Sequence, residues 1–123
     1  MKKILIVDDS STIANAMQRF LEAAGYEVDT RYESETFFDG RVTELDPDLV
    51  ILDINMPHFD GFYVLEMARK QKTCPRAKIM MCSTKIFEQD INRVKALGAD
   101  GFLMKPFNAE QLLTKVSEVI GAP

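Results

Sequence analysis

The chain has 123 residues, a formal net charge of −4 and 46% hydrophobic residues, which fits one globular domain over residues 1–123. A mildly acidic chain without a lysine or arginine cluster is unsuited to binding nucleic acid directly, because neutralising phosphates needs a basic face. The apolar runs are far shorter than the roughly 20 residues of a bilayer-spanning helix, and the N-terminus lacks the apolar region of a signal peptide. We therefore expect a cytoplasmic protein with no membrane insertion.

The residues that commonly bind soft metals are few and scattered. Cys74 and Cys82 are isolated in the sequence and predict reduced thiols, with Cys82 in the core and Cys74 in a loop. His58 is the one histidine, so a multi-histidine metal site is excluded. We expect His58 to be an exposed loop residue.

The first part of the chain alternates a short apolar run with helical periodicity. The run Lys3–Val7 is continuously apolar after its lysine and stops at Asp8, as a strand covered on both faces would. Helical spacing then predicts a helix that starts at Ser10 or Ser11 and ends at Gly25. Its expected apolar face consists of Ile13, Met17, Phe20, Leu21 and Ala24.

The next three segments continue the alternation. Glu27–Arg31 is polar for a strand, which predicts a position at the sheet edge. Residues 34–45 predict a weaker helix, because Gly40 in its interior costs about 1 kcal/mol relative to alanine. Residues 49–52 form a third apolar strand, which again stops at an aspartate, Asp53.

The second half predicts two helices separated by a strand. Residues 60–71 have the helical period, with Val64, Leu65 and Ala68 facing inward. Residues 77–82 form a fourth strand that stops at Ser83 and Thr84. A helix from about Ile86 to Leu97 then closes at Gly98.

The last strand and helix complete the pattern. Gly101–Met104 forms a fifth strand that stops at Lys105. Asn108 caps the final helix, with Gln111 three residues later as in a capping box. The apolar face of this helix consists of Leu112, Leu113, Val116 and Ile120.

Five strands that alternate with five helices predict an α/β fold with a doubly wound parallel sheet, because parallel strands need crossover connections. Such sheets bind ligands at the carboxyl ends of their strands. Polar residues gather at these ends, and a packed core gives no reason for it. They are Asp8 and Asp9 after the first strand, Asp53 after the third, Ser83 and Thr84 after the fourth, and Lys105 after the fifth.

These residue types suit one chemistry. Three carboxylates with no thiolate or imidazole favour a hard cation such as Mg²⁺. A carboxylate nucleophile with a cation, a lysine and a hydroxyl is the set needed for phosphoryl transfer to an aspartate. Taken singly, each residue has a plainer explanation as a helix cap, a solvated turn or a loop. The prediction depends on their common position at the strand ends.

Three motifs carry a family resemblance that extends over essentially the whole chain. IVDDS at 6–10, DLVILDINMP at 48–57 followed by Asp60-Gly61, and GADGFLMKPF at 98–107 closely resemble the receiver domains of two-component response regulators. The chain is most similar to the stand-alone, chemotaxis-regulator type. The resemblance implies a flavodoxin-like sheet in the order 2-1-3-4-5 and a cis peptide between Lys105 and Pro106.

The resemblance also implies a set of site residues. Asp53 would accept a phosphoryl group from a sensor histidine kinase or a histidine phosphotransfer protein. Mg²⁺ would be bound directly by Asp9, through water by Asp8, and by Asp53 and the backbone carbonyl of Asn55. Lys105 would pair with Asp53 and then with the phosphoryl group.

The same resemblance implies how the signal leaves the site. Ser83 would be the switch hydroxyl, and Phe102 the aromatic residue that turns inward after phosphorylation. The surface formed by the fourth helix, the fifth strand and the fifth helix would then change and control a downstream effector protein. Because the sequence ends at Pro123 without an effector domain, we expect a stand-alone regulator or a phosphorelay intermediate.

The sequence departs from the usual family pattern in three places. Thr84 is bulkier than the small residue that usually follows the switch hydroxyl, and Phe102 replaces the frequent tyrosine. The second helix carries Phe37, Phe38 and Gly40 where alanine and leucine are commoner.

Two other functions compete with the switch. An aspartyl-phosphate phosphatase would want a second carboxylate two residues after the nucleophile, where this chain has Asn55. A pseudo-receiver, which binds partners without phosphorylation, would lack an acid or the lysine, and none is missing. Asn55 and Lys85 flank the site and either control access of water to an acyl phosphate or are merely exposed loop residues.

Overall fold

The structure is a computed structural model that describes residues 1–84 and 87–123. Lys85, the predicted flank of the site, and Ile86, the predicted start of a helix, lie outside the described residues. The helices and strands are β1 (Lys3–Val7), α1 (Ser11–Ala23), β2 (Glu27–Arg31), a 3₁₀ helix η1 (Ser34–Phe38), α2 (Arg41–Leu45), β3 (Leu49–Asp53), α3 (Gly61–Gln71), β4 (Lys78–Ser83), α4 (Glu88–Ala96), β5 (Gly101–Met104) and α5 (Ala109–Ile120). Of the helices described, none is long and apolar enough to cross a membrane.

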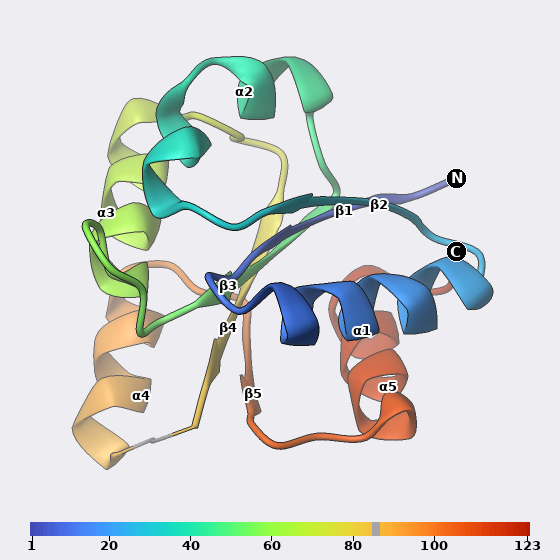
Figure 1. Ribbon diagram of the computed structural model, residues 1–123. Helices are drawn as coiled ribbons and strands as arrows, with labels where there is room; N and C mark the ends of the chain where they lie inside the picture. Colours follow the sequence, from blue (N-terminus) through green and yellow to red (C-terminus); the bar gives the residue numbers. More distant parts are fainter. Residues whose placement is uncertain (85–86) are drawn as a thin grey trace.

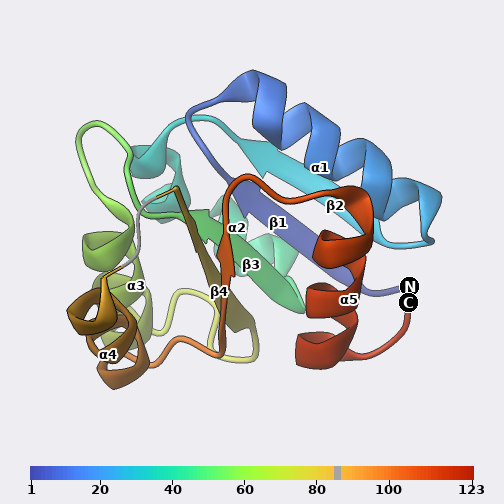
Figure 2. The same cartoon turned by 90° about the horizontal axis from the view of Figure 1, so that it is seen from below.

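The strands of the described chain form one sheet in the order β2-β1-β3-β4-β5. Every neighbouring pair is parallel. The predicted fold class and strand order are therefore confirmed, and β2 lies at the edge as its polar sequence indicated. The helices cover both faces, with α1 and α5 on one side of the sheet and α2, α3 and α4 on the other (Figures 1 and 2).

Alternation along each central strand fills the two cores. In β1, Leu5 and Val7 point into the core under α2, α3 and α4, whereas Ile4 and Ile6 point into the core under α1 and α5. The strands β3 and β4 divide their residues between the two cores in the same way. This double burial explains why the central strands are continuously apolar rather than alternating apolar and polar.

The predicted single helix over 34–45 is wrong, because the chain breaks at Gly40. There the backbone is left-handed, with φ of 92°, which ends η1 and starts α2 in a new direction. The aromatic residues of this segment do pack inward. Phe37 is fully buried, and Phe38 packs against the same core.

The predicted apolar face of α1 is partly wrong. Met17 and Leu21 are buried, but Phe20 is 39% exposed and Ala24 lies on the surface beyond the helix end. Ala14, which the periodicity did not select, takes the inward position nearest the site.

The other boundaries agree closely with the sequence. Ser10 is the N-cap of α1, and Asn108 forms the predicted capping box with Gln111. The peptide between Lys105 and Pro106 is cis. In α4, Val94 is buried.

The N-terminus of α3 packs directly on the end of β3. The Gly61 amide donates a hydrogen bond of 2.7 Å to the Ile54 carbonyl. A Cβ atom at Gly61 would lie 2.4 Å from the Asp53 carbonyl oxygen and 2.6 Å from the Cα of Ile54. Glycine is therefore the residue that lets the helix approach the backbone of Asp53 this closely.

We predict that Gly61→Ala lowers the free energy of unfolding by about 1–3 kcal/mol, the usual cost of overpacking rigid backbone. Urea denaturation measures this. Gly40→Asn is the matched control, because nothing lies within 4 Å of a Cβ there and asparagine tolerates the left-handed region. Equal losses in the two variants would contradict the close-approach argument.

Candidate functional site

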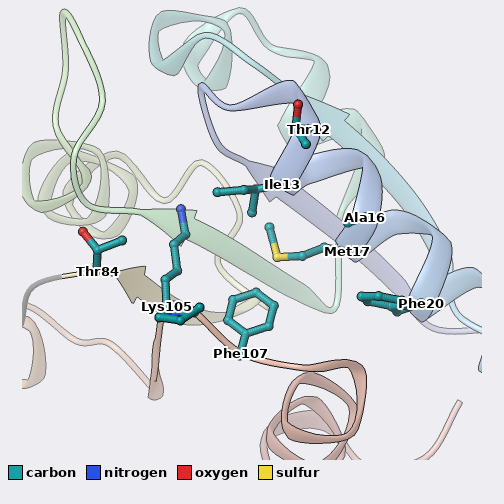
Figure 3. A pocket seen from close by; sticks show the side chains of 9 residues that line it. Thr12, Ile13, Ala16, Met17, Phe20, Thr84, Lys105 and Phe107 are labelled. Carbon is teal, nitrogen blue, oxygen red and sulfur yellow. The ribbon is translucent and has the colours of Figure 1, made fainter.

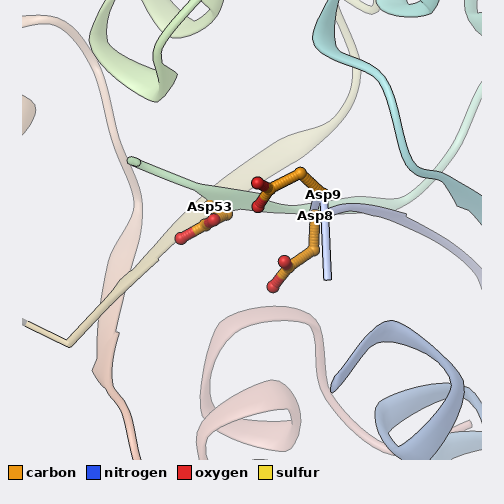
Figure 4. A group of neighbouring side chains, drawn as sticks. All are labelled: Asp8, Asp9 and Asp53. Carbon is orange, nitrogen blue, oxygen red and sulfur yellow. The ribbon is translucent and has the colours of Figure 1, made fainter. Parts of the chain in front are cut away.

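Three aspartates meet where β1 and β3 end. Asp8 and Asp9 follow the last residue of β1, and Asp53 is the last residue of β3. One carboxylate oxygen of each lies within 4.8 Å of the others (Figure 4). Asp8 and Asp53 are buried, whereas Asp9 is exposed. The cluster therefore has one side open to solvent and one side in the protein.

Lys105, directly after β5, places its ammonium between the two buried acids. Its Nζ donates a hydrogen bond of 2.7 Å to Asp8 Oδ2 and lies 3.3 Å from Asp53 Oδ1. The Lys105 side chain is itself only 8% exposed. The sequence predicted the pair with Asp53, but not the shorter contact with Asp8. The other oxygen of Asp8 accepts a hydrogen bond from the Ser10 amide at 2.9 Å, which ties this acid to the start of α1.

Burial and repulsion act on the ionisation of this site. Burial, followed by the negative charge of Asp8, raises the pKa of Asp53 to about 6, although Lys105 counteracts part of the shift. Burial alone would lower the pKa of Lys105, but the hydrogen bond to Asp8 and the charges of both acids outweigh it, so that pKa is raised. Lys105 is therefore a permanent cation at neutral pH. Keeping Asp53 ionised in the folded chain therefore costs free energy.

Ser83 ends β4 beside this cluster. Its side chain is buried, and its Oγ accepts a hydrogen bond of 3.2 Å from the Asn55 side-chain amide. Sequence reasoning assigned Asn55 a backbone role and did not foresee this side-chain contact. The two residues are 28 positions apart, so only the tertiary structure reveals it.

An apolar cavity of about 310 Å³ opens next to Lys105, between α1 and the segment after β5. Ile13, Met17 and Phe20 line one side and Phe107 the other, with Thr84 at the rim (Figure 3). The exposed ring of Phe20 thus belongs to this cavity. Thr84, which the sequence singled out as bulkier than usual, is exposed and lines the same cavity as Lys105.

Phe102 lies on β5, away from the acidic cluster. Its side chain is partly buried and packs against the core under α3 and α4. With Ile91, Val94 and Lys95 of α4 it lines a second cavity of about 350 Å³. Ile91 is partly buried, Val94 is buried and Phe87, the N-cap of α4, is 60% exposed.

The remaining residues singled out in the sequence have simple positions. Cys82 is buried, and burial raises the pKa of its thiol to about 12. Cys74 lies in a loop as predicted, but its side chain is also buried. His58 is exposed in the β3–α3 loop. The chemistry-bearing residues at the strand ends are therefore Asp8, Asp9, Asp53, Ser83 and Lys105.

The donor set fits a hard divalent cation. The acidic cluster supplies only carboxylate oxygens, as Mg²⁺ and Ca²⁺ prefer. One lysine cannot neutralise three acids, which leaves a net negative site with an exposed member, Asp9, facing solvent. A carboxylate nucleophile, an adjacent lysine and a hydroxyl donor at such a cluster are the parts of a phosphoryl acceptor.

We predict that Asp53→Asn makes the metal-free chain more stable at pH 7 by about 1–3 kcal/mol, because a buried charge disappears. In the wild type the folded chain binds a proton on Asp53 below about pH 6, whereas an unfolded aspartate binds it only near 3.8. Its stability should therefore rise as pH falls from about 6 to 4, relative to the variant. Urea denaturation with a chelator, at several pH values, measures this difference. If the free energy of unfolding changed equally with pH in the two proteins, the raised pKa of Asp53 would be contradicted.

Comparisons with known proteins agree with this geometry. The model of the response regulator receiver domain family matches residues 4–117. The Bacillus subtilis transcriptional regulatory protein YvcP is 37% identical over 124 residues, which cover 98% of this chain and 49% of that protein. The alkaline phosphatase synthesis transcriptional regulatory protein PhoP of the same organism is 36% identical over 119 residues, with 97% and 48% covered. The chain thus spans about half the length of these curated relatives.

Solved structures show the same fold. The chemotaxis response regulator CheY4 of Vibrio cholerae superposes with a TM-score of 0.88 at 35% identity, covering 97% of this chain and 98% of that one. A CheY-like receiver domain protein of Methanospirillum hungatei gives 0.87 at 31% identity, with 96% and 92% covered. Fold, strand-end chemistry and sequence therefore agree, and the chain belongs to the response regulator receiver domain family.

Proposed function

We propose that this chain is a cytoplasmic phosphorylation switch in which Asp53 accepts a phosphoryl group from a histidine kinase or a histidine phosphotransfer protein. The observation that supports this most is the position of Lys105 Nζ, 2.7 Å from Asp8 and 3.3 Å from Asp53. That ammonium can stay with Asp8 while it neutralises an oxygen of a phosphoryl group on Asp53.

In the proposed reaction, a carboxylate oxygen of Asp53 attacks the phosphorus atom of a phosphohistidine. The new bond is the O–P bond of an acyl phosphate, and the bond that breaks is the N–P bond of the donor. The imidazole leaves with the electron pair of that bond and takes up a proton. Water later hydrolyses the acyl phosphate, which restores the Asp53 carboxylate and releases inorganic phosphate.

The acidic cluster would hold the Mg²⁺ that we propose as the cofactor. Asp9, Asp53 and the backbone carbonyl of Asn55 are the proposed direct ligands, and Asp8 acts through a water molecule. A bound divalent cation would offset charge on the transferred oxygens. The assignment of Asp9 as a direct ligand is supported by its exposure, because Asp8 is buried and already bound to Lys105.

We propose that Ser83 and Phe102 transmit the change. The Ser83 hydroxyl would exchange its contact with Asn55 for one with the phosphoryl group, which brings about −1.5 to −2 charges. Phe102 would then turn into space vacated near β4. The Phe102 side chain is only partly buried and lines a cavity with α4 residues, so tight core packing does not enclose its ring on every side. The surface of α4, β5 and α5 would change, and an effector protein would read it.

Residues 1–123 act as a single receiver domain in this proposal. Both ends of the chain are tied to the same body, which supports this: the Tyr26 hydroxyl donates a hydrogen bond of 2.9 Å to the Gly121 carbonyl, and Lys2 donates to the Ile120 carbonyl. The protein would be a signalling switch that catalyses only its own phosphorylation and dephosphorylation.

We predict that acetyl phosphate with Mg²⁺ adds one phosphoryl group to the wild type and none to Asp53→Asn. Of the two buried acids that contact Lys105, Asp8 already accepts a hydrogen bond at each oxygen, from Lys105 and from the Ser10 amide, which leaves Asp53 as the nucleophile. Intact-mass spectrometry measures the addition. Asp60→Asn is the matched control, since Asp60 is an exposed helix cap outside the cluster, and it should be labelled like the wild type. Full labelling of Asp53→Asn would remove Asp53 from the acceptor role.

We also predict that Asp9→Ala weakens Mg²⁺ binding more than Asp8→Ala does. A direct ligand contributes more than an acid that acts through water, whose loss typically costs about tenfold to a hundredfold in affinity. Isothermal titration calorimetry of the folded variants gives both constants. An Asp9→Ala variant with wild-type affinity would refute the ligand assignment.

A further inference from the structure

A buried serine outside the acidic cluster is hydrogen-bonded to the loop that follows Asp53. Ser34, the first residue of η1, is only 2% exposed. Its hydroxyl donates a hydrogen bond of 3.0 Å to the Pro57 carbonyl and accepts one of 3.1 Å from the Phe59 amide. One hydroxyl thus uses its donor and an acceptor position on the same loop.

The bridged segment is a tight turn with an unfavourable backbone. His58, between the two bridged residues, has a left-handed φ of 67°, which is uncommon for any residue other than glycine. Such a conformation persists when the surrounding contacts enforce it. Ser34 binds the residues on both sides of His58, so it supplies two of those contacts.

Aromatic rings reinforce the same connection. Phe38 of η1 lies 6.0 Å from Phe59 in the loop and 6.4 Å from Tyr63 of α3, both edge to face. Phe59 and Tyr63 are 4.8 Å apart. Phe37, buried beneath, completes the cluster with Phe38 at 5.3 Å. Of Phe37 and Phe38, the two phenylalanines that depart from the usual family pattern, Phe38 therefore packs against the loop.

The start of this loop is the part that matters for the cation. Asn55 lies two residues before Pro57, and its backbone carbonyl is a proposed ligand. At the beginning of the loop, the Ile54 amide donates a hydrogen bond to the Cys82 carbonyl, and the Ile54 carbonyl accepts one from the Gly61 amide. The far half of the loop is fixed by Ser34. Asn55 therefore lies between two anchors, of which one belongs to the sheet and the other to η1.

We propose that Ser34 is a positioning residue that holds the 54–60 loop, and with it the Asn55 carbonyl, in the geometry that binds the divalent cation. This inference rests on the proposed function for the identity of the cation and its ligands. Ser34 touches neither the nucleophile nor the acidic cluster. Its effect passes through the turn at Pro57–Phe59.

The test compares Ser34→Ala with Thr36→Val. Both remove one hydroxyl from η1, but the Thr36 hydroxyl donates to Glu33 within its own segment and does not touch the loop. In a calorimetric titration with Mg²⁺ alone, Ser34→Ala should bind about tenfold more weakly than the wild type, because the loop that presents the Asn55 carbonyl loses one of its two anchors; tenfold is the lower end of what loss of a group that orients a ligand costs. Thr36→Val should bind like the wild type.

Labelling with acetyl phosphate separates positioning from general damage. Ser34→Ala should need about tenfold more Mg²⁺ for half-maximal rate, yet reach nearly the wild-type rate at saturation, because Asp53 and Lys105 are untouched. A folded Ser34→Ala variant with wild-type Mg²⁺ affinity would overturn the proposal. So would a variant whose rate falls at saturating Mg²⁺ while its affinity is unchanged.

Hydrogen exchange of backbone amides in the wild type tests the hydrogen bonds between Ser34 and the loop without any variant. The Phe59 amide should be protected although it lies outside every helix and strand, and an amide that exchanges as fast as an open loop would overturn the proposal even if Ser34→Ala failed to fold. If the wild type binds Mg²⁺ but is never labelled, the acceptor assignment fails. Mg²⁺ affinity and amide exchange then still decide the role of Ser34.

Discussion

The contact on which the site depends is the buried ammonium of Lys105, held between Asp8 and Asp53 at 2.7 and 3.3 Å. Two buried acids without a cation would be too costly to leave ionised. Lys105 offsets only part of that cost, because burial and the charge of Asp8 still raise the pKa of Asp53. The folded chain therefore holds a buried, incompletely neutralised carboxylate at the carboxyl end of β3. In the proposed function, this carboxylate is the group that binds the divalent cation and attacks the phosphoryl group.

This arrangement is possible because of the sheet order. Lys105 and Asp8 are 97 residues apart, yet β1, β3, β4 and β5 end at the same edge. Burial of both faces keeps the interior positions of β1, β3 and β4 apolar, so their charged and polar side chains stand at the strand ends. The same rule made the fold readable from the sequence. Continuous apolar runs that end in Asp, Ser or Lys predict both the parallel sheet and the place of its site.

Helical periodicity predicted the structure less reliably where a left-handed backbone or a tertiary contact determines the position of a residue. The break at Gly40 depends on a left-handed backbone that a helical pattern does not reveal. Phe20 has the period of a core residue but lines an open cavity. The Lys105–Asp8 pair, the Asn55–Ser83 hydrogen bond and the Ser34 bridge join residues distant in the sequence, so no local motif predicts them. Phe37 and Phe38 stand out in the sequence because alanine and leucine are commoner there in the family. In the structure Phe37 is buried in the core, and Phe38 packs against Phe59 of the loop.

The central claim is that Asp53, one of the two buried carboxylates beside Lys105, is the residue that becomes phosphorylated. The most direct measurement is to label the wild type with acetyl phosphate and Mg²⁺, reduce the product with borohydride, and map the reduced residue by peptide mass spectrometry. Borohydride converts an aspartyl phosphate to homoserine and leaves a free aspartate unchanged. The account predicts homoserine at position 53 alone. Homoserine at Asp8 or Asp9, or phosphate retained on a serine or threonine, would contradict it.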